Sequence, residues 1–258
     1  MPGNREVLPL ADGSIISASW DSTSIHQISA TGMLTSYGSG LSNSHGLIQM
    51  FDGNVLIGEG SPSVWTPNGT LVRKLSSAIS SAFLLSQMST GEVWLAGLGE
   101  NRVVRRNPDG TLIDTINDPA LVCQSVGSTT QLATGGYVVV CNHSGGNLFF
   151  LNPDRTMHKF AQAPAGMTLS ADGSITHPDL AGPIDMIQLP NGDLLIAGWV
   201  VPKLIRLHSD GPYIDSTVLG SGCGNNGCQF AAFSVTLDHT GRILMGMGDN
   251  QVRVAQFQ

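Results

Sequence analysis

Short stretches of alternating apolar and polar residues recur along the whole chain, and each of them ends in a turn dipeptide. The first such turns are Asp12-Gly13, Asp52-Gly53, Thr90-Gly91, Thr134-Gly135, Asn191-Gly192 and Thr240-Gly241. Glycine supplies the positive φ that two-residue hairpin turns need. A second strand follows each turn, at 14–18, 55–58, 92–96, 137–141, 193–197 and 242–246. The pattern therefore predicts antiparallel hairpins throughout the chain.

Each unit continues through a short Gly-, Ser- and Asn-rich loop into a third strand, a second turn and a fourth strand. The second turns include Asp109-Gly110 and Asp210-Gly211. Successive first turns are separated by 40, 38, 44, 57 and 49 residues. Four strands in about 40–45 residues is the blade period of a β-propeller. We therefore expect an all-β, six-bladed β-propeller of four-stranded antiparallel blades.

The six units fill the chain, which predicts a single domain over residues 1–258. The blades are expected at roughly 5–37, 46–76, 82–117, 127–161, 184–219 and 231–258. The last unit ends at Gln251–Gln256 and leaves no fourth strand, so blade 6 is expected to be three-stranded. An open edge templates pairing with another chain, so we expect a flanking domain or a neighbouring subunit to cover it.

The charged residues limit the classes of partner that the chain is expected to bind. Lys and Arg number only 12 against 19 Asp and Glu, which gives a net charge of −7, and the basic residues form no run. A nucleic-acid backbone needs a basic face, so no nucleic-acid partner is expected. No apolar stretch approaches 18 residues, so no membrane insertion is expected.

The four cysteines favour disulfides. Cys223 and Cys228 flank a short Gly- and Asn-rich loop that a local disulfide can close. Cys123 and Cys141 are 18 residues apart, a spacing that favours a disulfide over a zinc site. Their pairing needs a bulge, because an undistorted hairpin places Cys141 nearer residue 128. Disulfides predict an extracellular, cell-surface or periplasmic location, although no signal peptide is visible at the N-terminus and a cytosolic location is the alternative.

The repeat phrases resemble NHL-type repeats and, more loosely, the six-bladed regucalcin-like lactonases. The residues that carry the resemblance are Asn101–Val104, Asn107–Gly110 and Thr66–Gly69. Virginiamycin-lyase-like propellers are a neighbouring resemblance, but their repeat phrase is absent. The resemblance implies the propeller fold. It carries over no functional residue, because the matching residues form turns and strands.

Irregular loops converging on one mouth of the channel are the expected ligand site. The candidate ligand-binding residues on these loops are Trp20, Asp21, Glu59, Glu100, His143, Trp199 and Asp249. The four acids occupy related positions and either hold a cation such as Ca²⁺ or cap tight turns. His143 is either a general base or a loop-packing residue. The two tryptophans either stack on a sugar ring or pack between blades.

No Gly-x-Ser-x-Gly elbow and no His-x-x-x-His pair occurs, so the catalytic residues and any metal ligands remain unknown at this stage. The sequence favours an extracellular or cell-surface binding module over an enzyme. Its expected ligand is a glycan or a protein, its expected role includes adhesion, and we expect it to be part of a larger protein. The alternative is a metal-dependent hydrolase or lactonase with a divalent cation, Ca²⁺ for instance, in the central channel.

Overall fold

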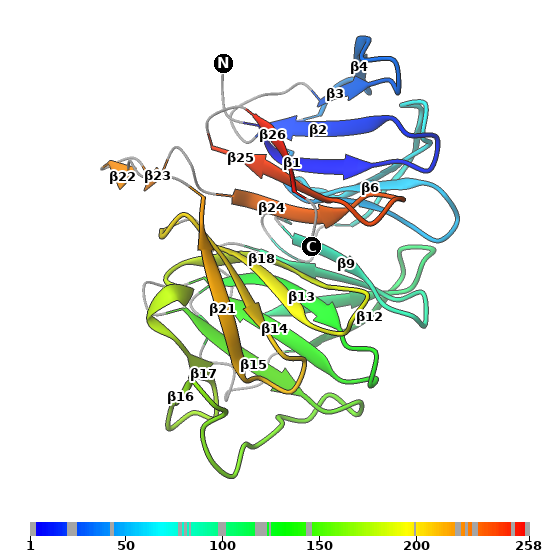
Figure 1. The fold of residues 1–258 in the computed structure, drawn as a ribbon. Coiled ribbons are helices and arrows are strands. Elements are labelled where there is room, and N and C mark those ends of the chain that lie inside the picture. The colour runs from blue at the N-terminus through cyan, green and yellow to red at the C-terminus, as the bar shows by residue number, and fades with distance from the viewer. Residues whose placement is uncertain are drawn as a thin grey trace.

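The structure, a computed structural model, is all-β, and its sheets form the ring of a six-bladed propeller (Figure 1). It describes residues 4–19, 25–41, 44–76, 79, 82, 84–97, 102–116, 123, 125–142, 146–198, 200–219, 223–224, 227–228, 232–248 and 251–255. The side chains of residues 4, 5, 19, 223, 224, 227 and 228 are not described. Within these ranges the one helix is the short 3-10 turn η1 (Pro178–Leu180). No helix among the described residues is long and apolar enough to cross a bilayer.

Blades 1, 2, 3 and 5 are four-stranded antiparallel sheets, as the repeat predicts. Blade 1 holds β1 (Asn4–Pro9), β2 (Ile15–Ser19), β3 (Ile25–Ile28) and β4 (Leu34–Tyr37). Blade 2 holds β5 (Leu47–Gln49), β6 (Val55–Ile57), β7 (Ser63–Trp65) and β8 (Leu71–Lys74). Blade 3 holds β9 (Leu84–Gln87), β10 (Val93–Ala96), β11 (Val103–Arg106) and β12 (Leu112–Ile116). Blade 5 holds β18 (Pro183–Gln188), β19 (Leu194–Gly198), β20 (Lys203–Leu207) and β21 (Tyr213–Val218).

Blade 4 departs from the simple repeat. Its first three strands are β13 (Val126–Gln131), β14 (Tyr137–Cys141) and β15 (Asn147–Leu151). The fourth position is filled by β17 (Ile175–Thr176), and β16 (Thr168–Leu169) pairs outside it. After the turn at Asp154-Arg155 the sequence predicts the fourth strand, but the structure has only an isolated bridge between Leu151 and Met157 there. The long crossing therefore supplies the fourth strand from further along the chain.

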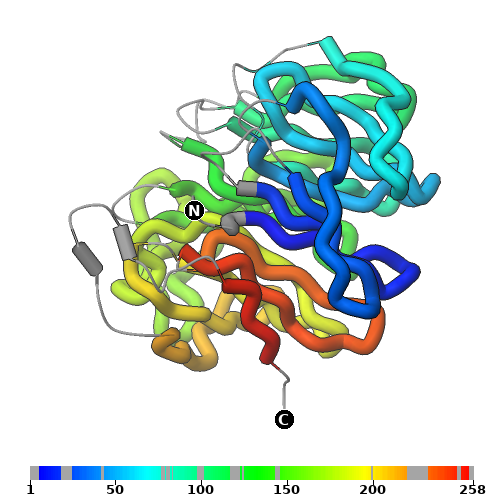
Figure 2. The backbone as a smooth tube through the Cα atoms, turned by 90° about the horizontal axis from the view of Figure 1, so that it is seen from above, coloured from blue at the N-terminus to red at the C-terminus, as the bar shows by residue number. Residues whose placement is uncertain are grey.

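Blade 6 has three strands among the described residues, as expected: β24 (Ala232–Leu237), β25 (Ile243–Met247) and β26 (Val252–Ala255). A separate hairpin of β22 (Cys223–Gly224) and β23 (Gly227–Cys228) precedes it. Figure 2 shows the chain passing round the ring from blue to red, so that the N-terminal strand β1 lies beside blade 6. At this seam the Val7 N–H donates a 3.3 Å hydrogen bond to Ser234 Oγ.

Apolar clusters between consecutive blades form the core. Trp94 of blade 3, for example, stacks on Tyr137 of blade 4 with ring centroids 4.6 Å apart. Comparable buried clusters join blades 1 and 2, 2 and 3, 4 and 5, and 5 and 6. At these five interfaces each blade buries one face against the next, and β1 lies against β24 and β25 where blades 1 and 6 meet.

Glutamines at the end of the innermost strands also tie one blade to the next. The side-chain oxygens of Gln87, Gln131 and Gln188 accept hydrogen bonds from turn N–H groups of the preceding blade. Those donors are Phe51, Ser89 and Ala133, at 2.7, 2.7 and 2.8 Å. The repeated glutamine therefore fixes the spacing of blades 2 to 5 at the turn face of the ring.

Arg155 is the one described non-glycine residue with positive φ, at 69°. It occupies a second-turn position at which the corresponding residues in blades 3 and 5 are Gly110 and Gly211. A side chain in this conformation costs about 1–2 kcal/mol. We expect Arg155→Gly to raise the free energy of unfolding by about 1 kcal/mol in urea denaturation. The inverse change Gly32→Arg, at a turn with open space, should lower it by a similar amount; a loss of stability in Arg155→Gly would contradict this account.

Candidate functional site

The innermost strands of all six blades line a central channel with a cavity of about 230 Å³. Each of β1, β5, β9, β13, β18 and β24 contributes to its wall. The residues of the wall include four that carry a hydroxyl group, Ser86, Thr129, Thr130 and Thr236, and two acidic residues, Glu6 and Asp185. A concave, largely pre-formed cavity with a few convergent polar groups is the usual form of a ligand site.

Four polar residues occupy the same position in four different blades: Glu6, Ser128, Asp185 and Ser234. We call them the channel belt. Each lies four residues before the residue whose carbonyl group accepts the hydrogen bond of the turn glycine; those residues are Leu10, Leu132, Leu189 and Asp238. All four belt residues therefore lie at the end of the inner strands opposite the Gly turns. Gly46 and Leu84 take this position in blades 2 and 3. The belt is therefore an arc across blades 4, 5, 6 and 1.

Four β-bulges create this arc. The register of the innermost strand shifts between Asn4 and Glu6, Val126 and Ser128, Pro183 and Asp185, and Ala232 and Ser234. A bulge adds one residue to a strand and re-aims the side chains that follow it. In each of these blades the residue directly after the bulge is the belt residue that lines the channel.

Asp185 is the most heavily bonded member of the belt. Its Oδ1 accepts from Ser128 Oγ at 3.1 Å and from the Met186 N–H at 2.8 Å. Its Oδ2 accepts from the Val235 N–H at 2.9 Å. Burial nevertheless raises the pKa of Asp185 to about 6, although these three hydrogen bonds act in the opposite direction.

Glu6 differs from Asp185 because its carboxyl group makes no hydrogen bond with any described residue. Burial, and secondarily the charge of Asp185, raise the pKa of Glu6 well above its usual value. Glu6 therefore keeps its proton to higher pH than an exposed glutamate. A protonated carboxyl both donates and accepts hydrogen bonds, so Glu6 offers the channel an uncommitted polar group.

The belt is suited to binding hydroxyl-bearing groups. It combines Glu6, whose pKa is raised well above its usual value, with Asp185, which ionises above a pKa of about 6, and with two serine hydroxyls. All four groups accept hydrogen bonds, and the hydroxyls and a protonated carboxyl also donate them. Within the described ranges, no three His, Cys, Asp or Glu side chains lie close enough together to hold a metal ion.

Most of the residues predicted from sequence as ligand-binding fall outside the described ranges. These are Trp20, Asp21, Glu100, His143, Trp199 and Asp249. Glu59 is described, and it is buried with only 2% of its surface exposed. Its carboxylate accepts a hydrogen bond from Ser63 Oγ, which in turn accepts from Trp65 Nε1 at 2.7 Å. Glu59 therefore holds the third strand of blade 2 in place.

None of the four belt residues is among the ligand-binding residues predicted from the sequence. One signal was available: Glu6 is an acid in the innermost strand of its repeat, where the aligned residues of blades 2 and 3 are Gly46 and Leu84. The bulges that turn these residues toward the channel leave no such signal, because any residue type can follow a bulge.

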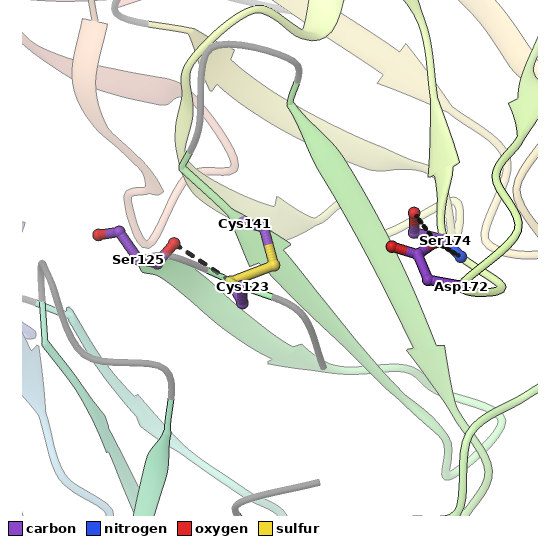
Figure 3. Close-up of a disulfide and its surroundings, with 5 residues drawn as sticks. All are labelled: Cys123, Ser125, Cys141, Asp172 and Ser174. Carbon is purple, nitrogen blue, oxygen red and sulfur yellow. Dashed lines mark hydrogen bonds between the residues drawn. A yellow bond between two sulfur atoms is a disulfide. The ribbon is translucent and has the colours of Figure 1, made fainter. Parts of the chain in front are cut away.

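The expected disulfide between Cys123 and Cys141 is present, with Cα atoms 5.4 Å apart (Figure 3). The bulge required for it is the one between Val126 and Ser128, which brings Val126 opposite Cys141. Cys123 also lies 3.2 Å from the carbonyl oxygen of Ser125. The disulfide therefore secures the strand end that aims Ser128 into the channel. Cys223 and Cys228 are directly opposite in the β22–β23 hairpin, but their side chains lie outside the described part, so that pairing stays a prediction.

The pH dependence of stability tests the burial of Glu6. Because its folded-state pKa is raised, its contribution to stability is complete below the unfolded value and is lost as pH rises through the folded value. Glu6→Gln cannot ionise, so its stability relative to the unchanged protein should increase from pH 4 to pH 8, by about 1.4 kcal/mol for each unit of pKa elevation. Urea denaturation across this range measures the difference.

Asp12→Asn provides the contrast, because hydrogen bonds from Ser14 lower the pKa of Asp12. Its contribution is present above the unfolded value and is lost as pH falls through the folded value. The difference between this variant and the unchanged protein should therefore change only below about pH 4, the ordinary pKa of an aspartate, and should stay flat from pH 4 to pH 8, where the Glu6→Gln difference grows. A Glu6→Gln difference that stays constant with pH would mean that Glu6 is not buried in the channel.

Removal of the disulfide tests its structural role. Both cysteines are 1% exposed, so the double variant Cys123→Ala and Cys141→Ala leaves no buried thiol. Closing a loop of this length stabilises a fold by about 3 kcal/mol through the unfolded chain, and we expect a loss of that size in urea denaturation. The matched double variant Cys223→Ala and Cys228→Ala measures the other pair. Four free thiols in mass spectrometry of the unreduced protein would contradict both pairings.

The sequence matches no protein-family model, and comparison with curated proteins finds no related sequence. Solved structures similar to the chain include virginiamycin B lyase from Staphylococcus aureus, at 14% identity and a TM-score of 0.68, covering 99% of this chain and 85% of that one. A streptogramin B lyase has 13% identity and a TM-score of 0.67, covering 98% and 94%. The WD40 β-propeller domain of Doa1 has 14% identity and a TM-score of 0.66, covering 100% and 94%. At these identities the likeness is one of fold, which is the β-propeller.

Proposed function

We propose that this chain is a ligand-binding module that takes a glycan at the belt end of its central channel. The observation that carries the proposal is the uncommitted carboxyl group of Glu6 in a cavity that polar side chains from several blades line. Glu6 is half-buried, and its carboxyl group makes no hydrogen bond with any residue that the structure describes. A ligand hydroxyl can supply a partner there, at a site where burial already disfavours the charged carboxylate.

The chemistry of the belt favours hydroxyl-bearing ligands. A sugar hydroxyl both donates and accepts, and so do a protonated Glu6 and the hydroxyls of Ser128 and Ser234. An anionic ligand would meet the negative charge of Asp185 once that group ionises above a pKa of about 6. A protein that inserts a serine, threonine or asparagine side chain would satisfy the same groups. Binding of proteins is therefore the alternative outcome of the test below.

The proposal includes an extracellular, cell-surface or periplasmic setting, because the Cys123–Cys141 disulfide persists in an oxidising compartment. It also includes membership of a larger protein with an adhesive role, and the NHL-like relationship of the repeats. The similar solved structures include both lyases and a WD40 propeller, so the fold is compatible with catalysis and with binding.

A glycan array probed with the unchanged protein and with Glu6→Leu tests the proposal. We expect selective binding to uncharged glycans, and a loss of affinity of at least about tenfold in Glu6→Leu, because a lost hydrogen bond to a buried polar group weakens binding by this order. Asp114→Asn, on the exposed outer strand β12, is the control and should bind unchanged.

Three results would contradict the proposal. Equal binding by Glu6→Leu would place the ligand elsewhere on the ring. A stoichiometric divalent cation in the purified protein, together with turnover of a panel of lactones and esters that chelation abolishes, would favour the metal-dependent hydrolase instead. Binding of proteins but of no glycan would keep the site and overturn the ligand class.

A further inference from the structure

The third strand of blade 6, β26, exposes a residue to solvent at a position that is buried in the third strand of blade 3. In blade 3 the third strand β11 is buried at all four positions, and Arg105 is 2% exposed. Val254 of β26 occupies the position of Arg105, because both lie opposite corresponding residues of the second strand, Leu244 and Trp94. Val254 is 55% exposed. The difference is the covering strand that blade 3 has and blade 6 lacks among the described residues.

The hydrogen-bonding groups of this edge follow from its register. The Met247 N–H donates to the Gln251 carbonyl at 2.9 Å, and Met245 lies opposite Arg253. Paired residues in an antiparallel ladder alternate between bonding inward and pointing outward. The N–H and C=O groups of Val252 and Val254 therefore point away from β25. An added strand can bond to them without disturbing the blade.

The charge of the edge indicates what kind of strand fits it. In blades 3 and 5 an arginine of the third strand pairs with an aspartate of the fourth: Arg105 with Asp114 at 2.7 Å, and Arg206 with Asp215 at 2.6 Å. On β26 the charged residue is Arg253, half-buried, which donates to the Leu219 carbonyl at 3.2 Å. Arg253 lies on the opposite face of the blade from Val254, so a carboxylate must sit one position further along an incoming strand to meet it.

A second copy of the chain fits this edge poorly. The antiparallel register that bonds both outward-facing valines, Val252 to Val254 of the other copy, places the two Arg253 side chains directly opposite each other. Like charges in that position destabilise a strand pair.

We infer that β26 is a docking edge for an extended acidic segment of another polypeptide, which completes blade 6 as an antiparallel fourth strand. The segment places a carboxylate beside Arg253 and an apolar or β-branched residue over Val254. This surface is separate from the channel belt, so the inference stands apart from the proposed glycan site.

The probe is a fluorescein-labelled peptide with the sequence of residues 111–117 in which residues 114 and 115 are exchanged. In the register of blade 3 its aspartate then lies opposite Arg253 and its threonine lies over Val254. The peptide is titrated with the 258-residue protein by fluorescence anisotropy. A control peptide carries lysine in place of its aspartate. We expect saturable binding of the acidic peptide, and binding of the lysine peptide that is at least about tenfold weaker.

The protein variant Val254→Pro removes an N–H that points away from β25, so the blade keeps its own ladder while the docking bond is lost. Val218→Pro makes the same change on the outer strand of blade 5, which is already complete, and thermal melts check that both variants fold. We expect Val254→Pro to lower the affinity for the acidic peptide by about tenfold and Val218→Pro to leave that affinity unchanged. No saturable binding, or equal binding by Val254→Pro, would overturn the inference. A concentration-dependent dimer that Val254→Pro abolishes would overturn it in favour of a second copy.

Discussion

The carboxyl group of Asp185 joins three blades at one end of the channel. It accepts hydrogen bonds from Ser128 of blade 4, from its own neighbour Met186 in blade 5, and from the backbone of Val235 in blade 6. A buried carboxyl group is costly without such partners. The ring therefore has to hold these three strands in register, and the position of Glu6 in the next blade follows from the same closure.

The channel belt results from the same β-bulge repeated in four blades. Each belt residue follows a bulge in its own innermost strand, and the same bulge position in four blades brings four polar side chains around one channel. The disulfide secures one of these strand ends. The enclosed channel also raises the pKa values of two belt residues, because low solvent access keeps Glu6 and Asp185 protonated to higher pH than free carboxyls.

Much of the fold was predictable because its determinants are local. Turn dipeptides such as Asn191-Gly192 specify hairpins, and their spacing specifies blades, including a blade 6 that has three strands in the described part of the chain. The fourth position of blade 4 was not predictable, since β17 comes from beyond a long crossing. The belt was not predictable either. Whether Ser128 faces the channel depends on a one-residue bulge, and a one-residue shift reverses the face of every side chain in a strand.

Titration of the two channel carboxyl groups shows directly whether the ring shields them from water. Side-chain carbon chemical shifts of Glu6 and Asp185, followed by NMR from pH 3 to pH 9 and assigned with Glu6→Gln and Asp185→Asn, give the apparent pKa values of the pair. If the ring shields these groups, both steps lie above the ordinary pKa of exposed carboxyls, which is about 4, and the step near 6 is lost in Asp185→Asn. Two independent titrations near 4 would show that water reaches both groups freely and that the ring does not enclose a binding site.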